Sequence, residues 1–405
     1  MLIRKAYKQK LKTRLKERTI FSKAVGCNRF VWNYFLAKNL YYLENGMRIM
    51  SYVEMNWFLT NFLKKSEEYK FLKDAHSQTL QQTLKNLERA FKDWFDKSQP
   101  KKKKPRFKSR GKCKDNGVKF PQGVKVDGNR VYIPKIGWIR FFKSYDIKGT
   151  IKNLHLLKES DGWYISIQVE YEELILPRKD SSSVGADWGV KNFVTMSDGT
   201  VFKPNDSLEK YERKLRIAQR AVSRKQKGSK NKGKSQKKVA KIHKKIANCR
   251  NDHIHKSTTT ICKNHTLIVI EDLNVANMSK SAKGDIDNPG KNVKAKSGLN
   301  KSILNQAPYE FRRQLEYKST WYGSKVQAVD PKYSSQTCSS CGYKSKENRK
   351  TQEKFVCVEC GFSKNADINA AINLLNRGRA ALVSPTDINA NVSWHGGESP
   401  VLALH

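Results

Sequence analysis

Two CxxC cysteine pairs near the end of the chain constrain its fold more than any other feature. Fifteen residues separate the two CxxC pairs, which are Cys338 with Cys341 and Cys357 with Cys360. Each pair can supply two thiolates to a tetrahedral zinc ion, and this spacing is typical of a four-cysteine site. Gly342 and Gly361 follow the pairs, where a tight turn needs a permissive backbone. Four cysteine ligands leave zinc no open position, so the predicted zinc is structural; a redox role for the pairs is the alternative.

The segment after the second pair, "NADINAAINLLNRG", has the periodicity of a helix and carries one acid near its start. Asp367 has Ala370, Ala371 and Leu374 at positions i+3, i+4 and i+7, so its face of the helix is small and apolar. Such side chains would let the helix approach a sheet closely. The local explanation is that Asn365 caps the helix and Asp367 favours the helix dipole.

Two further acids stand at the ends of apolar strands. Asp187 lies in "VGADWG" and Glu271 directly follows "LIVI", with Asp272 beside it as a residue that could equally form a turn. Each acid alone has a structural explanation about as good as a catalytic one. Three carboxylates that converge where parallel strands end would repel one another unless a divalent cation neutralises them. Carboxylates favour Mg²⁺ or Mn²⁺, and two such ions can activate water and stabilise the leaving oxygen in phosphodiester hydrolysis.

The charge of the chain indicates a polyanionic partner. Its 405 residues include 80 Lys and Arg against 37 Asp and Glu, a formal net charge of +43. Nucleic acid is the expected partner, because each phosphate contacted by a basic side chain releases condensed counterions; a negatively charged membrane surface is the competing interpretation. The start, "MLIRKAYKQK", lacks the apolar core of a secretory signal, and no run of about 18 apolar residues could span a bilayer. We therefore expect an intracellular protein.

The first part of the chain predicts a helical domain over residues 17–98. Residues 19–44 carry apolar residues at helical spacing, and Ser51 with Glu54 forms a capping box for the next helix. A third helix has its apolar residues on one face, namely Leu80, Leu84, Leu87, Phe91, Trp94 and Phe95.

A basic tract and a β domain follow, over residues 99–178. The tract "PKKKKPRFKSR" contains two prolines and no acid, so it predicts an extended segment that contacts phosphates or is simply solvated. Its candidate phosphate contacts are Lys101, Lys102, Lys103, Lys104, Arg106, Lys108 and Arg110. In the strand-like runs that follow, Asp127-Gly128 and Asp161-Gly162 are typical of hairpin turns.

Residues 180–378 alternate strands and helices, which predicts an α/β domain with one mixed sheet. "VGADWGVKNFVTMSDGTVF" predicts three strands joined by turns. A basic helical hairpin follows, with Gly228 and Gly233 as its turn. "TLIVIEDL" predicts a buried strand, residues 303–322 a helix, and "SKVQAVD" another strand. The tail after residue 378 has the weak periodicity typical of a disordered segment.

These blocks resemble the TnpB family, RNA-guided endonucleases encoded by insertion-sequence transposons, and the related small type V CRISPR effector nucleases. The resemblance covers nearly the whole chain, from "NRFVWNYFLAKN" and "KKKPRFKSR" through "VGADWGVKNF" to the three most specific blocks, "IVIEDLNV", "YSSQTCSSCGY" and "CVECGFSKNADINAAINLLNRG". It implies that Asp187, Glu271 and Asp367 hold two Mg²⁺ ions in a RuvC nuclease domain. Asp330, in "AVDPKYSS", is a rival for the third acid, but the "NADINAAINL" match favours Asp367. One departure is that Ala186 and Trp188 flank the first aspartate, where the family has aliphatic residues.

The resemblance implies a multidomain α+β chain. Its parts are the N-terminal strand of a β-barrel-like wedge domain (1–16), a helical recognition domain (17–98), the rest of the wedge domain (99–178), the first part of an RNase H-like RuvC α/β domain (179–335), an inserted four-cysteine zinc ribbon that binds the target nucleic acid (336–363), the final RuvC helix (364–378) and a tail (379–405).

The function that the resemblance implies is RNA-guided cleavage of double-stranded DNA next to a short motif. The expected partners are a non-coding guide RNA and the target DNA, and the expected protein is a monomer in the cytoplasm of a bacterial or archaeal cell, associated with the nucleoid. Two alternatives stay open. One is a nuclease-inactive RNA-guided DNA-binding regulator, which the three intact acids disfavour. The other is a guide-independent nuclease associated with transposition.

Overall fold

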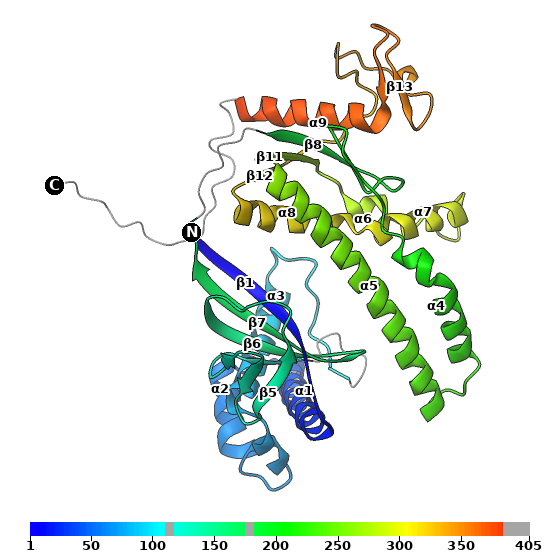
Figure 1. Ribbon diagram of the computed structural model, residues 1–405. Coiled ribbons are helices and arrows are strands. Elements are labelled where there is room, and N and C mark those ends of the chain that lie inside the picture. Colours follow the sequence, from blue (N-terminus) through cyan, green and yellow to red (C-terminus); the bar gives the residue numbers. More distant parts are fainter. Residues whose placement is uncertain (110–116, 175–181, 384–405) are drawn as a thin grey trace, which may run out of the picture. The chain divides into compact units, whose positions relative to one another are not determined.

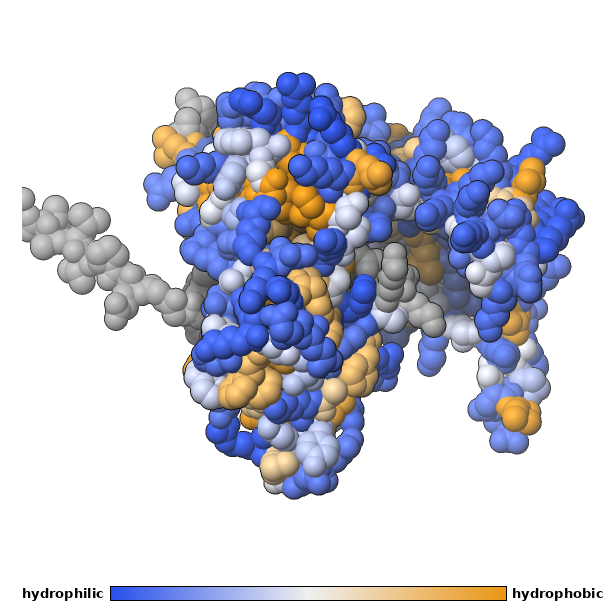
Figure 2. Space-filling view, turned by 90° about the horizontal axis from the view of Figure 1, so that it is seen from below, coloured by the Kyte–Doolittle hydropathy of each residue, from blue (hydrophilic) through white to orange (hydrophobic). Residues whose placement is uncertain are grey.

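The computed structural model describes residues 1–109, 117–174 and 182–383 and has a mixed α/β architecture (Figure 1). The chain divides into two compact units, Met1–Leu174 and Ile175–His405. Hydrophilic residues cover most of the face shown in Figure 2, as expected for a chain with a formal net charge of +43. Within the described ranges, no helix combines the length and the apolarity needed to cross a bilayer.

Three helices form the helical part of the first unit: α1 (Leu15–Glu44), α2 (Tyr52–Phe58) and α3 (Ser77–Phe95). A π-helical turn (Leu59–Leu63) extends α2, and a 3-10 helix (Lys70–Asp74) precedes α3. The predicted capping box is confirmed, because the Ser51 hydroxyl accepts from the backbone N–H of Glu54 while Glu54 accepts from that of Ser51. The predicted face of α3 is buried at Leu80, Leu84, Leu87 and Phe91. Trp94 is half-buried, and Phe95 is 47% exposed because the helix ends at this residue.

The β part of the first unit is a seven-stranded antiparallel sheet in the order β2-β6-β7-β1-β5-β4-β3. Its strands are β1 (Leu2–Leu11), β2 (Gly117–Phe120), β3 (Lys125–Asp127), β4 (Arg130–Ile133), β5 (Gly137–Phe142), β6 (Thr150–Glu159) and β7 (Gly162–Glu172). Both predicted hairpins are present, between β3 and β4 and between β6 and β7. Helix α1 is tied to this sheet by Phe21, whose ring packs edge-on at 5.0 Å from Trp163.

The second unit is built on a five-stranded mixed sheet in the order β10-β9-β8-β11-β12, as predicted. Its strands are β8 (Ser183–Trp188), β9 (Val194–Met196), β10 (Val201–Phe202), β11 (Leu267–Glu271) and β12 (Lys325–Val329). Strand β11 pairs in parallel with β8 and with β12, whereas β9 and β10 are antiparallel. The carboxyl ends of β8 and β11 therefore lie at one edge of the sheet.

Helices cover both faces of this sheet (Figure 1). Helix α9 (Ala366–Val383) lies on one face, and α5 (Lys230–Asn264) and α8 (Pro308–Tyr322) lie on the other. As predicted, small residues let the last helix approach closely: a Cβ atom on Gly185 of β8 would lie 1.9 Å from the carbonyl oxygen of Ala371. The final helix runs to Val383, five residues beyond the predicted end.

Two sequence expectations for the second unit are wrong in detail. The predicted helix 303–322 is two helices, α7 (Val293–Gln306) and α8, because Ala307 takes a left-handed conformation directly before Pro308. The basic hairpin consists of α4 (Ser207–Ser223) and α5, and its turn contains Gly228 with φ of +88°. Gly233 instead lies inside α5, because Ser229 already caps that helix through the N–H of Lys232.

Candidate functional site

The four cysteines of the two CxxC pairs come together as the spacing predicts. Their sulfur atoms lie within 4.8 Å of one another, with Cys338 and Cys360 at 3.7 Å and Cys341 and Cys357 at 3.6 Å. These separations fit a tetrahedral zinc ion, whose bonds of about 2.3 Å place sulfur atoms roughly 3.8 Å apart. The backbone N–H of Cys360 lowers the pKa of Cys357 to about 7, which favours the thiolate that zinc needs.

The segment that holds the cysteines forms a small module of its own, Thr337–Asn365, inserted between β12 and α9. It contains a 3-10 helix (Lys346–Asn348) and the strands β13 (Lys354–Val356) and β14 (Ser363–Asn365), which pair with each other. The turns after the pairs use glycines with positive φ, +79° at Gly342 and +69° at Gly361. We call this segment the cysteine module.

The three predicted acids line one cavity of about 320 Å³ at the carboxyl edge of the second sheet. Strand alternation points Asp187, at the end of β8, and Glu271, at the end of β11, toward the face covered by α9, whose first turn carries Asp367. The rival Asp330 does not line this cavity; its side chain is 61% exposed and accepts from the backbone N–H of Lys332. Asp272 points elsewhere and pairs with Arg312.

Two of the three acids have raised pKa values. Burial, followed by the negative charges of Glu271 and Asp367, raises the pKa of Asp187 well above its ordinary value. Burial also raises the pKa of Glu271 to about 7, although a hydrogen bond from Ser334 opposes this shift. A cation bound beside Asp187 and Glu271 would favour their ionised forms and so oppose both shifts. The donor set therefore fits hard divalent ions such as Mg²⁺ or Mn²⁺.

Arg349 of the cysteine module reaches into this cavity, a position that no sequence motif predicts. Its guanidinium donates to Asp367 Oδ1 at 3.1 Å and to the carbonyl oxygen of Gln352 at 2.8 Å. Its charge opposes the rise in the pKa of Asp187. A second ion pair joins Glu353 of the module to Lys191, another residue that lines the cavity. No spacing rule marks Arg349, since the residues between the two CxxC pairs carry several basic side chains.

Helix α9 also holds the cysteine module directly, through two buried asparagines. The Asn369 side chain accepts from the backbone N–H of Ser339 at 3.0 Å and donates to the carbonyl oxygen of Thr337 at 2.8 Å. Asn373 donates to the same Thr337 oxygen at 2.7 Å and to that of Ser334 at 2.9 Å. The module is thus clamped to the helix that carries Asp367.

The basic tract of the first unit is exposed over most of its length but is fixed in place. Trp32 donates its indole N–H to the carbonyl oxygen of Arg106 at 3.0 Å, and Asn33 makes two hydrogen bonds with the backbone of Lys108. Lys102 pairs with Asp93 at 3.1 Å. Lys101, Lys103 and Lys104 are exposed and carry their charges in solvent. Arg110 lies outside the described residues.

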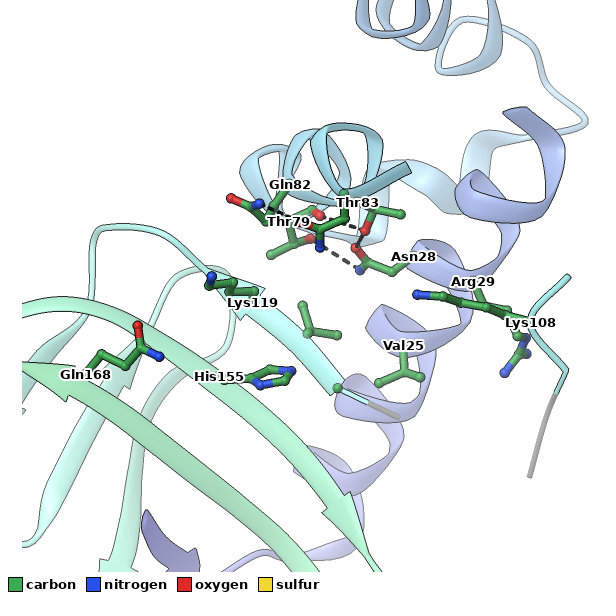
Figure 3. A pocket seen from close by; sticks show the side chains of 13 residues that line it. Val25, Asn28, Arg29, Thr79, Gln82, Thr83, Lys108, Lys119, His155 and Gln168 are labelled. Carbon is green, nitrogen blue, oxygen red and sulfur yellow. Dashed lines mark hydrogen bonds between the residues drawn. The ribbon is translucent and has the colours of Figure 1, made fainter. Parts of the chain in front are cut away.

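A second cavity, of about 260 Å³, lies in the first unit between α1, α3 and the sheet (Figure 3). Asn28 donates to Thr79 Oγ1 at 3.4 Å and accepts from the Thr83 hydroxyl at 2.6 Å. Gln82, which lines the cavity, donates to Asn86 at 3.0 Å. The remaining lining residues are mostly polar or basic, namely Val25, Arg29, Lys108, Gly117, Val118, Lys119, His155 and Gln168. The sequence carries no motif for it, because its members come from six separate segments.

Three family models match parts of the chain. Residues 166–282 match a model described as "Probable transposase", and residues 309–374 match one described as "Cas12f1-like, TNB domain". Residues 1–47 match a "Helix-turn-helix domain", although in this structure they form β1 and the single helix α1.

Several curated proteins are similar to the chain. It is 46% identical over 359 residues to "Putative RNA-guided DNA endonuclease InsQ" of Escherichia coli (strain K12), with 88% of each chain covered. It is 31% identical over 386 residues to "Putative RNA-guided DNA endonuclease" of Streptomyces pristinaespiralis, which covers 94% of this chain and 90% of that protein. Over 72 residues it is 42% identical to "CRISPR-associated endodeoxyribonuclease Cas12f1" of Sulfoacidibacillus thermotolerans, covering 18% and 17% of the two chains.

Proposed function

Because the chain belongs to the TnpB family of transposon-encoded proteins, we propose that it is an RNA-guided DNA endonuclease with a divalent-metal-dependent RuvC site. One observation carries the catalytic part of this proposal. Asp187, Glu271 and Asp367 come from three separate elements, yet they line one cavity at the edge of the sheet. A chain that needed these acids only for solubility or helix capping would have no reason to collect them against their mutual repulsion.

Asp187, Glu271 and Asp367 would together hold two Mg²⁺ ions. When bound, such ions supply an activated water and stabilise the oxygen that leaves the phosphodiester. The protein residues orient the acids: the Gly185–Ala371 contact sets the distance of α9 from the sheet, and Asn369 and Asn373 fix the module beside it. Arg349, already at hydrogen-bond distance from Asp367, supplies a positive charge on the side where a DNA phosphate would enter.

The cysteine cluster would hold a structural zinc ion. The zinc has no place in the chemistry, because four thiolates fill its coordination. It would instead keep the segment Cys338–Cys360 compact, so that residues 349–353, the arm of the module, reach the acid cavity. Residues 309–374, which match the model described as "Cas12f1-like, TNB domain", include this module and the start of α9.

The positive charge of the chain would bind guide RNA and its heteroduplex with DNA through their backbones. The exposed lysines of the tract 101–108 are candidate phosphate contacts in the first unit. The α4–α5 hairpin of the second unit is another candidate site of phosphate contact, because every charged residue from Arg224 to Lys245 is basic. The sequence of the target would be read by base pairing, as in other RNA-guided nucleases.

The cavity of the first unit would read the short motif beside the target. Its amide and hydroxyl groups can both donate to and accept from base edges, and Lys119 and Arg29 can hold the flanking phosphates (Figure 3). Gln82→Ala with Asn86→Ala should therefore change which motif supports cleavage, in a library of plasmids randomised beside a fixed target. An unchanged motif would place this reading elsewhere.

Sequencing the RNA that copurifies with the full-length chain is the experiment that tests the guided part of the proposal. We expect a defined non-coding RNA with a variable end, and cleavage of a plasmid that carries the complement of that end. Ribonuclease treatment before DNA is added should abolish targeted cleavage. Cleavage that survives ribonuclease would instead indicate a guide-independent nuclease, and RNA-dependent binding without cleavage would indicate a regulator.

A further inference from the structure

A third cavity, of about 310 Å³, opens at the same edge of the second sheet as the acid cavity. Trp188 and Glu271 line both cavities, so the two hollows are neighbours that share a wall. Strand alternation turns Trp188 toward the face of α8, away from Asp187. The lining residues that bear on its ligand are Ile270, Tyr309, Phe311, Arg312, Arg313 and Glu316.

The walls of this cavity suit a flat and mostly apolar group. Its floor is aliphatic and aromatic, with Ile270 and Phe311 almost fully buried. Tyr309 stands at its rim with 70% of its surface exposed, although it lies next to this apolar hollow. Trp188 Nε1 is buried without a hydrogen-bond partner in the described part of the chain. An indole N–H in this state is a donor that a ligand could satisfy after a small movement of the ring.

The charged groups at the rim disfavour a phosphate as the occupant. Arg312 is already paired with Asp272 and Glu316, and Arg313 makes two hydrogen bonds with Glu310. Glu271 and Glu316 add carboxylates to the lining itself. Carboxylate oxygens repel a phosphate but can accept hydrogen bonds from the amino groups of adenine, cytosine or guanine. A neutral heterocycle therefore matches this cavity better than any anion does.

We propose that the third cavity, the Trp188–Tyr309 pocket, binds one unstacked nucleobase of the DNA strand being cut, at a nucleotide next to the scissile phosphate. This inference rests on the proposed nuclease function, because the shared wall places the base beside the acids. Tyr309 stacks on the base, as aromatic side chains do in proteins that hold single strands. The pocket thereby fixes the position of the phosphate in the acid cavity, and the residues that form it are positioning residues.

The test uses the full-length chain with its copurified RNA and a 5′-labelled single-stranded DNA whose cut position has been mapped. An abasic nucleotide is placed in turn at each position on both sides of the cut. We expect one position at which loss of the base slows wild-type cleavage roughly tenfold. Tyr309→Ala should be slowed by a similar factor on intact DNA, and the abasic nucleotide should slow it no further.

Two control variants separate stacking from folding. Tyr309→Phe is the conservative variant that keeps the ring, and it should restore the sensitivity of cleavage to the abasic nucleotide that Tyr309→Ala loses. Tyr41→Ala removes an aromatic side chain of similar exposure, 59%, that lies far along the chain in α1, and it should retain the abasic effect. The pocket proposal is overturned if no position near the cut is sensitive, or if the effects of Tyr309→Ala and the abasic nucleotide multiply.

A binding measurement distinguishes failure of the pocket from failure of the nuclease. In the Asp187→Asn background, 2-aminopurine is moved along the same DNA, and its fluorescence should be quenched at one position only. Adding Tyr309→Ala should restore that fluorescence. Position-specific quenching without any cleavage by the wild type would support the base-binding pocket and contradict the proposed nuclease activity. Cleavage with no position-specific quenching would keep the nuclease and remove the pocket.

Discussion

The second unit contains two clusters of side chains, proposed here to bind metal ions, that are assembled in opposite ways. All four cysteines lie in one short segment, and two glycine turns suffice to bring their sulfur atoms within 4.8 Å. The three acids come from β8, β11 and α9, and they meet only when the whole sheet has formed and α9 has packed on it. The comparison shows that within one domain a cluster can be assembled from a single short segment or from elements far apart in the sequence.

The two clusters are nevertheless joined. Arg349 of the cysteine module donates to Asp367. Asn369 and Asn373 of α9 make hydrogen bonds with the backbone at the start of the module, beside its first CxxC pair. The acid cluster thus depends on the cysteine module for its arginine, and the module depends on α9 for hydrogen bonds to its backbone. This mutual dependence can be tested from both sides.

The largest effect is expected from Asp187→Asn, which removes one charge of the acid cluster and keeps the size of the side chain. Mg²⁺-dependent cleavage should fall by at least about 10³-fold, because the metal loses a ligand, while RNA binding and zinc content stay unchanged. Radiolabelled DNA cleavage and metal analysis check this. Asp330→Asn is the matched control, since Asp330 is exposed and outside the cavity. Normal cutting by Asp187→Asn would remove this acid from the site.

Cys357→Ser should produce the next largest effect. It tests whether the acid cluster depends on the cysteine module. Loss of one thiolate should release zinc, loosen the arm that carries Arg349 and lower cleavage by about 10- to 100-fold. Zinc content and cleavage are measured on the same preparation. Cys249→Ser, at a half-buried cysteine outside the module, should change neither. Zinc loss with full cleavage would show that the two clusters are independent.

Gly185→Ala tests how closely the acid cluster depends on backbone packing. A Cβ atom there would meet the Ala371 carbonyl oxygen at 1.9 Å, so α9 must move away from the sheet. We expect a loss of about 1–3 kcal/mol in the free energy of unfolding, together with weaker cleavage. Thermal unfolding measures the first effect. Gly298→Ala is the control, because nothing lies within 4 Å of its added Cβ; equal behaviour of the two variants would contradict the tight contact.

The smallest effect concerns the stability of the metal-free protein. The pKa of Glu271 is raised to about 7, so the folded state holds this proton more tightly than the unfolded state. Stability is then lost as pH rises from the ordinary value of about 4.5 toward 7. Glu271→Gln removes that loss and should raise the melting temperature in chelator by about 2–4 °C at pH 8, with a smaller change at pH 5. An identical change at both pH values would mean that burial of this charge is not the cause.

The difference in assembly also explains what could be predicted from the sequence. The cysteine site follows from spacing alone, and the strand-end acids could be paired because Asp187 and Glu271 each end an apolar strand. Arg349 could not be predicted, since its partner is set by how the module folds back onto α9. The break between α7 and α8 did carry a signal, because a residue before proline disfavours the helical conformation and Ala307 precedes Pro308. The cavities depend on side chains from many segments and leave no motif.

Helix α5 gives the second unit a mechanical property. It has 35 residues and a length of about 52 Å, but its fully buried side chains, Ile254, Thr258, Ile261 and Cys262, all lie in its last third. Ser235 and Ile246, nearer its start, are also buried, and α4 packs along the helix, so the α4–α5 hairpin forms one arm on a fixed root. A tilt of about 10° at the root would move the basic tip by roughly 6 Å. Strand β11 begins at Leu267, just after the end of α5. A movement of the helix tip, for example on binding nucleic acid, would therefore be passed along a continuous stretch of backbone to Glu271.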